Sequence, residues 1–192
     1  GGKVDGQTVL ALLDALDHGV GKHAHALFLE QLCKVLTELA VHAGQQAVKA
    51  LERQALDHFR RDHPNFPEYA IPPQPYRDDT ANGLTKCIVD YIRYNGGQAE
   101  RINTTGMPEQ RGGQIVWRKS NATKGSADIS ATIAGRSVKI EVKIGLDRQS
   151  EAQRRYQATV ERAGGLYFIA KDFTSFIEWY SEKLNRDCYG KS

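Results

Sequence analysis

Residues 127–143 contain two alternating apolar runs on either side of a short reversal, and this feature constrains the fold most. The runs are ADISATI (127–133) and SVKIEVK (137–143), with Ala134 and Gly135 between them. Alternation of apolar and polar residues predicts β-strands that each bury one face. Two such runs joined by a two-residue turn predict an antiparallel hairpin. The chain is therefore expected to contain a sheet with one core face.

A two-residue turn fixes which residues of the hairpin face each other. The turn pairs Ile133 with Arg136. The same register places Asp128 opposite Glu141, and directly opposed residues share one face with Cβ atoms about 4.5–5.5 Å apart. Lys143 is two residues from Glu141 and therefore lies on that face as well. The other face collects apolar side chains and is the predicted core face: Ile129, Ala131, Ile133, Val138, Ile140 and Val142.

The opposed carboxylates of Asp128 and Glu141 repel each other unless a cation lies between them. A hard divalent cation resolves the repulsion, and Mg²⁺ takes one or two carboxylates together with water and substrate phosphate. Lys143 beside the two acids could polarise a water molecule or neutralise charge that develops on a phosphoryl centre. A metal ion, two carboxylates and a lysine are what phosphodiester hydrolysis needs. The alternative is a solvent-facing strand with an ordinary Glu-x-Lys salt bridge.

A predicted helix, QSEAQRRYQATVERAG (149–164), follows the second strand closely. Gln153 and Tyr156 are three residues apart and share one face of this helix. A helix in this position could direct Gln153 toward the two acids or toward a phosphate. The alternative is that Gln153 is an exposed helix residue and Tyr156 belongs to the core.

The remaining patterns around the hairpin predict an α/β domain. LYFIAK (166–171) is almost continuously apolar, which is typical of a buried strand. The order of elements predicts a mixed sheet flanked by helices. Helices are expected over 80–95, 149–164 and 173–185, and strands over 99–103, 114–120, 127–133, 137–143 and 166–171.

The first part of the chain predicts helices only. Apolar residues recur at helical spacing in three runs, the first two ended by glycine, which predicts a small helical bundle: 8–19, 23–44 and 45–59. The segment 64–76 holds five of the six prolines, so it cannot form a regular helix or a central strand. We therefore expect a helical region at 1–63, a Pro-rich linker at 64–76 and an α/β domain at 77–192.

Charge and cysteine content indicate the environment and the partner. Residues 1–75 contain 7 Lys/Arg against 9 Asp/Glu, a net charge of −2, and residues 76–192 contain 19 against 14, a net charge of +5. A basic C-terminal part is compatible with a polyanionic partner such as nucleic acid. No apolar run is long enough to span a bilayer. Three widely spaced cysteines without a C-x-x-C motif fit a reducing cytoplasm, so we expect a cytoplasmic protein without a membrane partner.

Four sequence features follow one another in the second half of the chain: Asp128, Glu141-x-Lys143, Ser150-x-x-Gln153 on a helix, and Gly164-Gly165 before an apolar strand. Their order resembles the PD-(D/E)xK nuclease superfamily, with the closest likeness to the VRR-NUC branch and the Holliday-junction-resolvase-like phage nucleases. The resemblance covers roughly residues 80–192. It implies a restriction-endonuclease-like fold and cleavage of DNA that depends on Mg²⁺ or Mn²⁺.

The resemblance also implies roles for individual residues. Asp128 and Glu141 would be metal ligands together with the backbone carbonyl of Val142, Lys143 would be the catalytic lysine, and Gln153 would be an additional polar residue of the site. Two positions depart from the family pattern. Ala127 stands where a proline is usual, and the acid of the first helix has no clear equivalent. The candidates to replace it are Asp79, Asn82 and Asp90.

Basic side chains gather near the predicted site. In the Gly-rich segment 104–126 they accompany an aromatic residue, a combination that suits a loop contacting a phosphate backbone or stacking on a base. The alternatives are a loop without nucleic-acid contacts, with Trp117 in the core, and a solvated helix face for the later arginines. The candidate nucleic-acid-binding residues are Arg111, Trp117, Arg118, Lys119, Lys124, Arg148 and Arg154, with Arg155 beside them.

The first hypothesis is a metal-dependent DNA endonuclease, selective for structures such as junctions or flaps. A homodimer is compatible with this activity, because a two-fold dimer can cut two paired strands; the helical region would serve dimerisation or DNA positioning. The second hypothesis is a nucleic-acid-binding module on a nuclease fold that has lost cleavage. A third, a purely structural interaction protein, predicts no binding of DNA or Mn²⁺.

Overall fold

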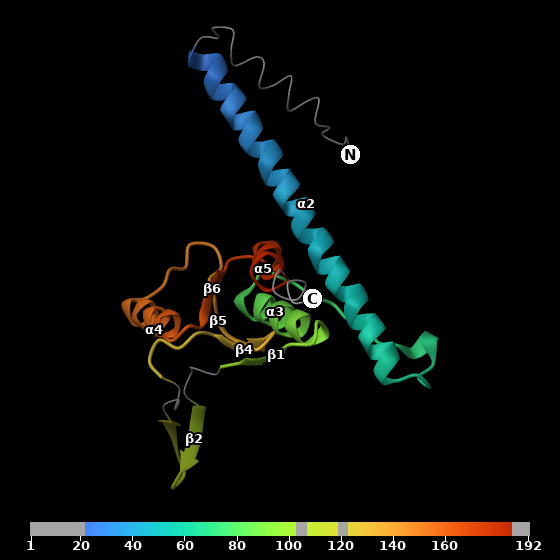
Figure 1. Cartoon of the computed structure of the whole chain (residues 1–192), viewed down its shortest axis with the longest axis vertical. Coiled ribbons are helices and arrows are strands. Elements are labelled where there is room, and N and C mark those ends of the chain that lie inside the picture. The colour runs from blue at the N-terminus through green and yellow to red at the C-terminus, as the bar shows by residue number, and fades with distance from the viewer. Residues whose placement is uncertain (1–21, 103–106, 119–122, 186–192) are drawn as a thin grey trace, which may run out of the picture. The chain divides into compact units, whose positions relative to one another are not determined.

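The computed structural model of the chain describes residues 22–102, 107–118 and 123–185 (Figure 1). The chain divides into two compact units between Gln45 and Gln46, and each is described by itself. The predicted helix at 8–19 and the candidate residue Lys119 lie outside the described residues. Among the described residues, no helix is long and apolar enough to cross a membrane.

A single helix, α2 (Lys22–Asp62), occupies the region where two helices were expected. The prediction that Gly44 ends a helix was wrong, and the described residues of this region form one helix of 41 residues in place of two bundled helices. The residues after Gly44 are good helix formers and no proline follows until Pro64. An interior glycine costs only about 1 kcal/mol relative to alanine, so the run of backbone hydrogen bonds continues through it.

The Pro-rich segment is mostly irregular, as its composition predicts. Within 64–76 the regular structure is one 3-10 turn, η1 (Glu68–Ala70). At the end of the segment Tyr76 is buried, and its hydroxyl donates to Asp90 Oδ2 at 2.9 Å. The backbone N–H of Tyr76 donates to Glu52 Oε1 of α2 at 3.2 Å. Leu51 of α2 belongs to the same hydrophobic core as the sheet, so the C-terminal part of α2 packs within the second unit.

The second unit is built on a four-stranded mixed sheet in the order β1-β4-β5-β6, which confirms the expected α/β fold with flanking helices. β1 pairs antiparallel with β4, and β4 pairs antiparallel with β5. β6 pairs parallel with β5, and the helix α4 connects these two strands in the chain. The elements in chain order are α3 (Ala81–Tyr94), β1 (Gln98–Arg101), β4 (Ile129–Ile133), β5 (Arg136–Val142), α4 (Glu151–Arg162), β6 (Leu166–Ala170), α5 (Phe173–Tyr180) and the π-helical turn η2 (Ser181–Asn185).

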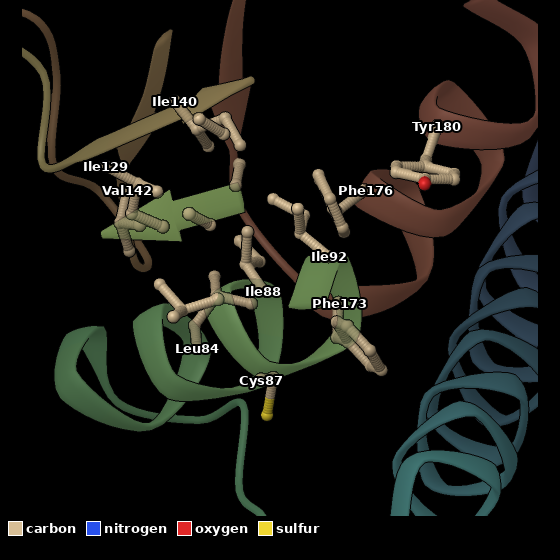
Figure 2. Packing of buried hydrophobic residues seen from close by; sticks show 14 of the residues in the cluster. Leu84, Cys87, Ile88, Ile92, Ile129, Ile140, Val142, Phe173, Phe176 and Tyr180 are labelled. Atoms are coloured by element: carbon tan, nitrogen blue, oxygen red, sulfur yellow. The ribbon is translucent and has the colours of Figure 1, made fainter. Parts of the chain in front are cut away.

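The core lies between one face of this sheet and the helices α3 and α5 (Figure 2). Figure 2 shows Leu84, Ile88 and Ile92 of α3 turned toward the hairpin strands. Phe173 and Phe176 of α5 belong to the same core. The six hairpin residues predicted to form the core face are all buried, which confirms that prediction: Ile129, Ala131, Ile133, Val138, Ile140 and Val142.

The strand β6 is less buried than its apolar sequence predicts. It lies at an edge of the sheet, with β5 as its hydrogen-bonded neighbour. Four of its five residues are half-buried, and only Ala170 is fully buried. Phe168 packs against the core, its ring centroid 4.7 Å from that of Trp179, whereas Tyr167 points to the opposite face. An edge position leaves one side of the strand uncovered, which a run of apolar residues does not reveal.

The Gly-rich segment forms a separate hairpin rather than a strand of the main sheet. β2 (Met107–Arg111) pairs antiparallel with β3 (Gln114–Arg118) in a two-stranded sheet of its own. The turn consists of Gly112 and Gly113, with φ of 56° and 80°. A two-residue turn with both φ values positive matches the right-handed twist of the strands and favours glycine. The predicted strand at 114–120 therefore exists, but in another sheet.

Candidate functional site

The acids predicted to oppose each other do lie side by side. β4 and β5 pair with Ile133 opposite Arg136 and Ile129 opposite Ile140, which is the predicted register. The pairing ends at Ile129 and Ile140, and Asp128 and Glu141 are the next residues beyond it, close enough for the charge of Asp128 to act on Glu141. The backbone N–H of Val142 donates to Asp128 Oδ2 at 2.9 Å, which holds the Asp128 carboxylate at the end of the hairpin.

Glu141 is the most enclosed charged residue of the site, with 1% of its surface exposed. Three side chains donate to its carboxylate. Lys143 Nζ lies 3.1 Å from Oε1, and Gln153 Nε2 donates to the same oxygen. The hydroxyl of Tyr167 lies 3.4 Å from Oε2. The site therefore combines side chains from β5, α4 and β6.

The electrostatics of Glu141 match the repulsion expected from the sequence. Burial raises the pKa of Glu141 above its ordinary value of 4.5, and the nearby charge of Asp128 raises it further. The hydrogen bond and the charge of Lys143 act in the opposite direction but do not cancel the increase. Two carboxylates in a poorly solvated place thus favour a cation or a proton between them.

Lys143 is held between two carboxylates. Its side chain is 10% exposed, and Nζ lies 3.1 Å from both Glu141 Oε1 and Asp147 Oδ2. Burial lowers the pKa of Lys143, but the bonds to Glu141 and Asp147 outweigh burial and leave the pKa raised. Lys143 is therefore a fixed ammonium group at neutral pH.

Two residues of the site were not found from the sequence. Asp147 reaches Lys143 because the chain reverses after β5, where the N–H of Asp147 donates to the carbonyl of Ile144 at 3.2 Å. The only local signal was its spacing of four residues from Lys143. Tyr167 comes from β6. Its pairing with Lys139 of β5 places it on the face of the sheet that carries Glu141. Burial and the charge of Glu141 raise the pKa of Tyr167, so this hydroxyl stays protonated.

The helix α4 brings Gln153 to the acids, as one of the two sequence interpretations expected. Ser150 caps the helix by accepting from the N–H of Gln153 at 3.3 Å. Gln153 Oε1 accepts from the N–H of Ser150 at 2.8 Å, which completes a capping box. The other end of the same amide donates to Glu141. Tyr156 lies on this face too, with its ring 6.4 Å from that of Tyr167.

Gly125 lets the segment before Asp128 approach the start of α4. Its φ is +82°, and a Cβ atom there would lie 2.5 Å from the backbone carbonyl of Ala152 and 2.8 Å from the N of Gln153. A side chain at this position would push the helix away from the hairpin. The glycine in the Gly-Ser-Ala sequence before Asp128 thus has a packing role in the site.

The donor set at this face fits a hard divalent ion. Asp128 and Glu141 supply carboxylate oxygens, the ligands that Mg²⁺ prefers. Among the described residues, no group of three or more His, Cys, Asp and Glu side chains is arranged to hold a metal. An ion bound here would complete its shell with backbone carbonyl, water and substrate oxygens, the usual arrangement for Mg²⁺.

The candidates for the acid of the first helix lie in other contacts. Asp79 pairs with Arg77 at 2.6 Å. Asn82 Oδ1 accepts from Arg101 at 2.8 Å. Asp90 accepts from the hydroxyl of Tyr76 and lies 3.2 Å from Lys86 Nζ. None of these contacts of Asp79, Asn82 and Asp90 involves Glu141 or Lys143.

The candidate nucleic-acid-binding residues divide into two groups. Lys124, Arg148 and Arg154 are exposed. Arg148 and Arg154 lie just before and within the first turn of α4, and Lys124 precedes Gly125, which closely approaches Ala152 of α4. Arg154 donates to the carbonyl of Gln149 at 2.9 Å, and Arg155 pairs with Glu151.

The second group lies on the β2–β3 hairpin. Arg111 is exposed there, 3.7 Å from Glu109. Trp117 and Arg118 belong to β3, but their side chains lie outside the described residues. The structure therefore assigns Arg111 to the hairpin and not to the acid cluster.

No protein-family model matches the chain, and no curated protein matches it. The class of the protein follows from the structure alone: a mixed α/β fold with a four-stranded sheet, flanking helices and a long helix before them.

Proposed function

We propose that the chain is a metal-dependent DNA endonuclease that hydrolyses phosphodiester bonds at the face formed by β4, β5 and α4. The observation that supports this most is the acid pair with its lysine. Asp128 lies at the end of the hairpin, where its Oδ2 accepts from the N–H of Val142 at 2.9 Å, next to Glu141, and Lys143 Nζ lies 3.1 Å from Glu141. The resemblance of the motif order to PD-(D/E)xK nucleases points to the same chemistry.

Each residue has a separate task in this proposal. The carboxylates of Asp128 and Glu141, with the carbonyl of Val142, hold Mg²⁺ or Mn²⁺. The bound ion supplies a Lewis acid and lowers the pKa of water. Lys143, kept as an ammonium group by its two carboxylate neighbours, stabilises negative charge that develops on the phosphoryl oxygens. Gln153 positions the Glu141 carboxylate from α4.

The second candidate function is a nucleic-acid-binding module that does not cleave. One observation favours it: Asp79, Asn82 and Asp90, the three candidates for a further polar ligand, contact Arg77, Arg101 and Tyr76 rather than the acid pair. A site with two carboxylates would then bind a metal and a phosphate without the full machinery for hydrolysis.

Cleavage assays separate the two candidates. The protein is incubated with supercoiled, branched, flapped and single-stranded DNA in Mg²⁺, Mn²⁺ or EDTA, and Lys143→Met is tested beside it. Lys183→Met is the matched control. Lys183 pairs with Glu182 on η2, next to the core residue Leu184, and is not part of the acid pair. Metal-dependent products that Lys143→Met abolishes and Lys183→Met retains support the endonuclease. Binding without products supports the module, and absence of both contradicts both candidates.

The oligomeric state bears on how two strands would be cut. A homodimer would give paired incisions on the two strands of a branched substrate. Light scattering of the protein with and without a junction measures this directly. Single nicks from a monomer would leave the chemistry of the proposal in place and remove the dimer from it.

A further inference from the structure

The polar face of the sheet continues beyond the two acids along the same strands. Two residues after Asp128 and two residues before Glu141, the register pairs Ser130 of β4 with Lys139 of β5. Because side chains alternate between the faces, this pair lies on the same face as the acids. Lys139 Nζ donates to Ser130 Oγ at 2.5 Å.

The surroundings of Lys139 differ from those of Lys143. Lys143 lies between two carboxylates, whereas the hydrogen-bond partner of Lys139 is a neutral hydroxyl. An ammonium group has three donors, so this contact leaves donors and the full charge of Lys139 for a ligand. The carboxylates of Asp128 and Glu141 lie two residues away on the same face, about 6.6 Å along the strands, and Glu100 faces Ser130 from β1, two strand spacings or about 9.6 Å from β5.

This part of the face is only partly covered. The helix α4 packs over β6, where Tyr156 contacts Tyr167, and α3 and α5 pack on the core face. Ser130 and Lys139 are both half-buried, so part of each residue remains exposed at this face.

We propose that Ser130 and Lys139 form a phosphate subsite that binds the backbone phosphate next to the one at the acid pair. This inference rests on the proposed nuclease function. Two residues along a strand span about 6.6 Å, close to the separation of consecutive phosphates in a nucleic-acid strand. The substrate strand therefore runs along β5, from Glu141 toward Arg136, with one phosphate at each of the two rows.

The test measures binding of a labelled DNA duplex in EDTA as a function of salt concentration. Lys139→Gln is expected to weaken binding several-fold and to reduce the slope of log K against log salt by about one, because one phosphate contact is lost. Lys139→Arg is expected to restore the slope. Lys183→Gln is the matched control, because Lys183 is an exposed lysine on the core side of the sheet. It is expected to keep the wild-type affinity for DNA and the wild-type salt slope.

Cleavage kinetics give a second readout. With Mg²⁺, Lys139→Gln is expected to raise KM more than it lowers kcat, because the contact holds substrate away from the reacting phosphate. A salt slope equal to that of Lys183→Gln would overturn the subsite even if the wild type cleaves DNA. So would a lowered melting temperature with an unchanged slope, which would make the pair structural. If the wild type neither binds nor cleaves DNA, the proposed function fails and the subsite fails with it.

Discussion

The side-chain amide of Gln153 joins the first turn of α4 to Glu141. Its oxygen accepts from the N–H of Ser150, and its nitrogen donates to the Glu141 carboxylate. Because each end of the amide has its own partner, its orientation is determined. The helix cap and the acid site are thereby coupled: a change that moves one moves the other.

Replacing Gln153 separates the two tasks of the amide. Gln153→Glu keeps a side chain that can complete the capping box, but it replaces the donor to Glu141 by a third carboxylate. We expect a loss of about 1–3 kcal/mol of folding free energy at pH 7 in EDTA. Close carboxylates raise the pKa of one another, so the loss should shrink as the pH falls. Thermal melts at several pH values measure this. A loss that stays constant with pH would contradict it.

The raised pKa of Glu141 predicts a pH dependence of stability. A group with a raised folded-state pKa contributes stability that is present below its ordinary value of 4.5 and is lost as the pH rises through the folded value. Glu141→Gln lacks this loss, so in EDTA its melting temperature should gain on the wild type between about pH 4 and pH 7. The exposed Glu178→Gln is the control. If the melting temperature of the wild type rises relative to that of Glu141→Gln between these pH values, the prediction is refuted.

Lys143→Met should lower stability because it leaves Glu141 buried without its cation. Breaking one partner of a buried ion pair costs about 3–5 kcal/mol, and in the Lys143–Glu141 pair the two side chains are 10% and 1% exposed. In the double variant Lys143→Met/Glu141→Gln the cost should largely disappear, since no unpaired charge remains. A double-mutant cycle from denaturant melts gives the coupling energy. Additive effects would mean that the two side chains do not interact.

Gly125→Ala should separate α4 from the hairpin. The new Cβ would lie 2.5 Å from the backbone of Ala152, in addition to the strain of φ at +82°. Strain alone costs about 1–2 kcal/mol. Gly164→Ala isolates that part, because Gly164 has φ of +81° and open space around it. We expect Gly125→Ala to be clearly less stable than Gly164→Ala and to lose any cleavage. Equal melting temperatures would show that the close approach is unimportant.

Gly44→Ala tests the continuity of α2. Inside a helix, alanine is favoured over glycine by about 1 kcal/mol, so this variant should raise helix content and stability. Gly96→Ala is the contrast: Gly96 follows α3 with φ of +80°, so alanine there should be destabilising. Far-UV circular dichroism and thermal melts report both. A destabilised Gly44→Ala would mean that this glycine ends a helix.

The hairpin shows how far local rules reach. A side-chain period of two and a two-residue turn depend only on neighbours in the sequence, so they predicted the register, the core face and the shared face of Asp128, Glu141 and Lys143. The same kind of rule failed at Gly44, where a glycine can either end a helix or lie inside it. At β6, an apolar run did not distinguish an edge strand from a central one.

The sequence by itself determined the helices and strands of the main sheet and the acid face of the hairpin, because both follow from periodicity along short stretches of chain, but it did not predict the strand β2. Only the tertiary structure decided that Gln153, Tyr167 and Asp147 converge on the Glu141–Lys143 pair. The reason is physical: α4, β6 and the turn after β5 are positioned by long-range packing and strand pairing, such as the contact of Gly125 with Ala152. That same packing buries Glu141 and shifts its pKa.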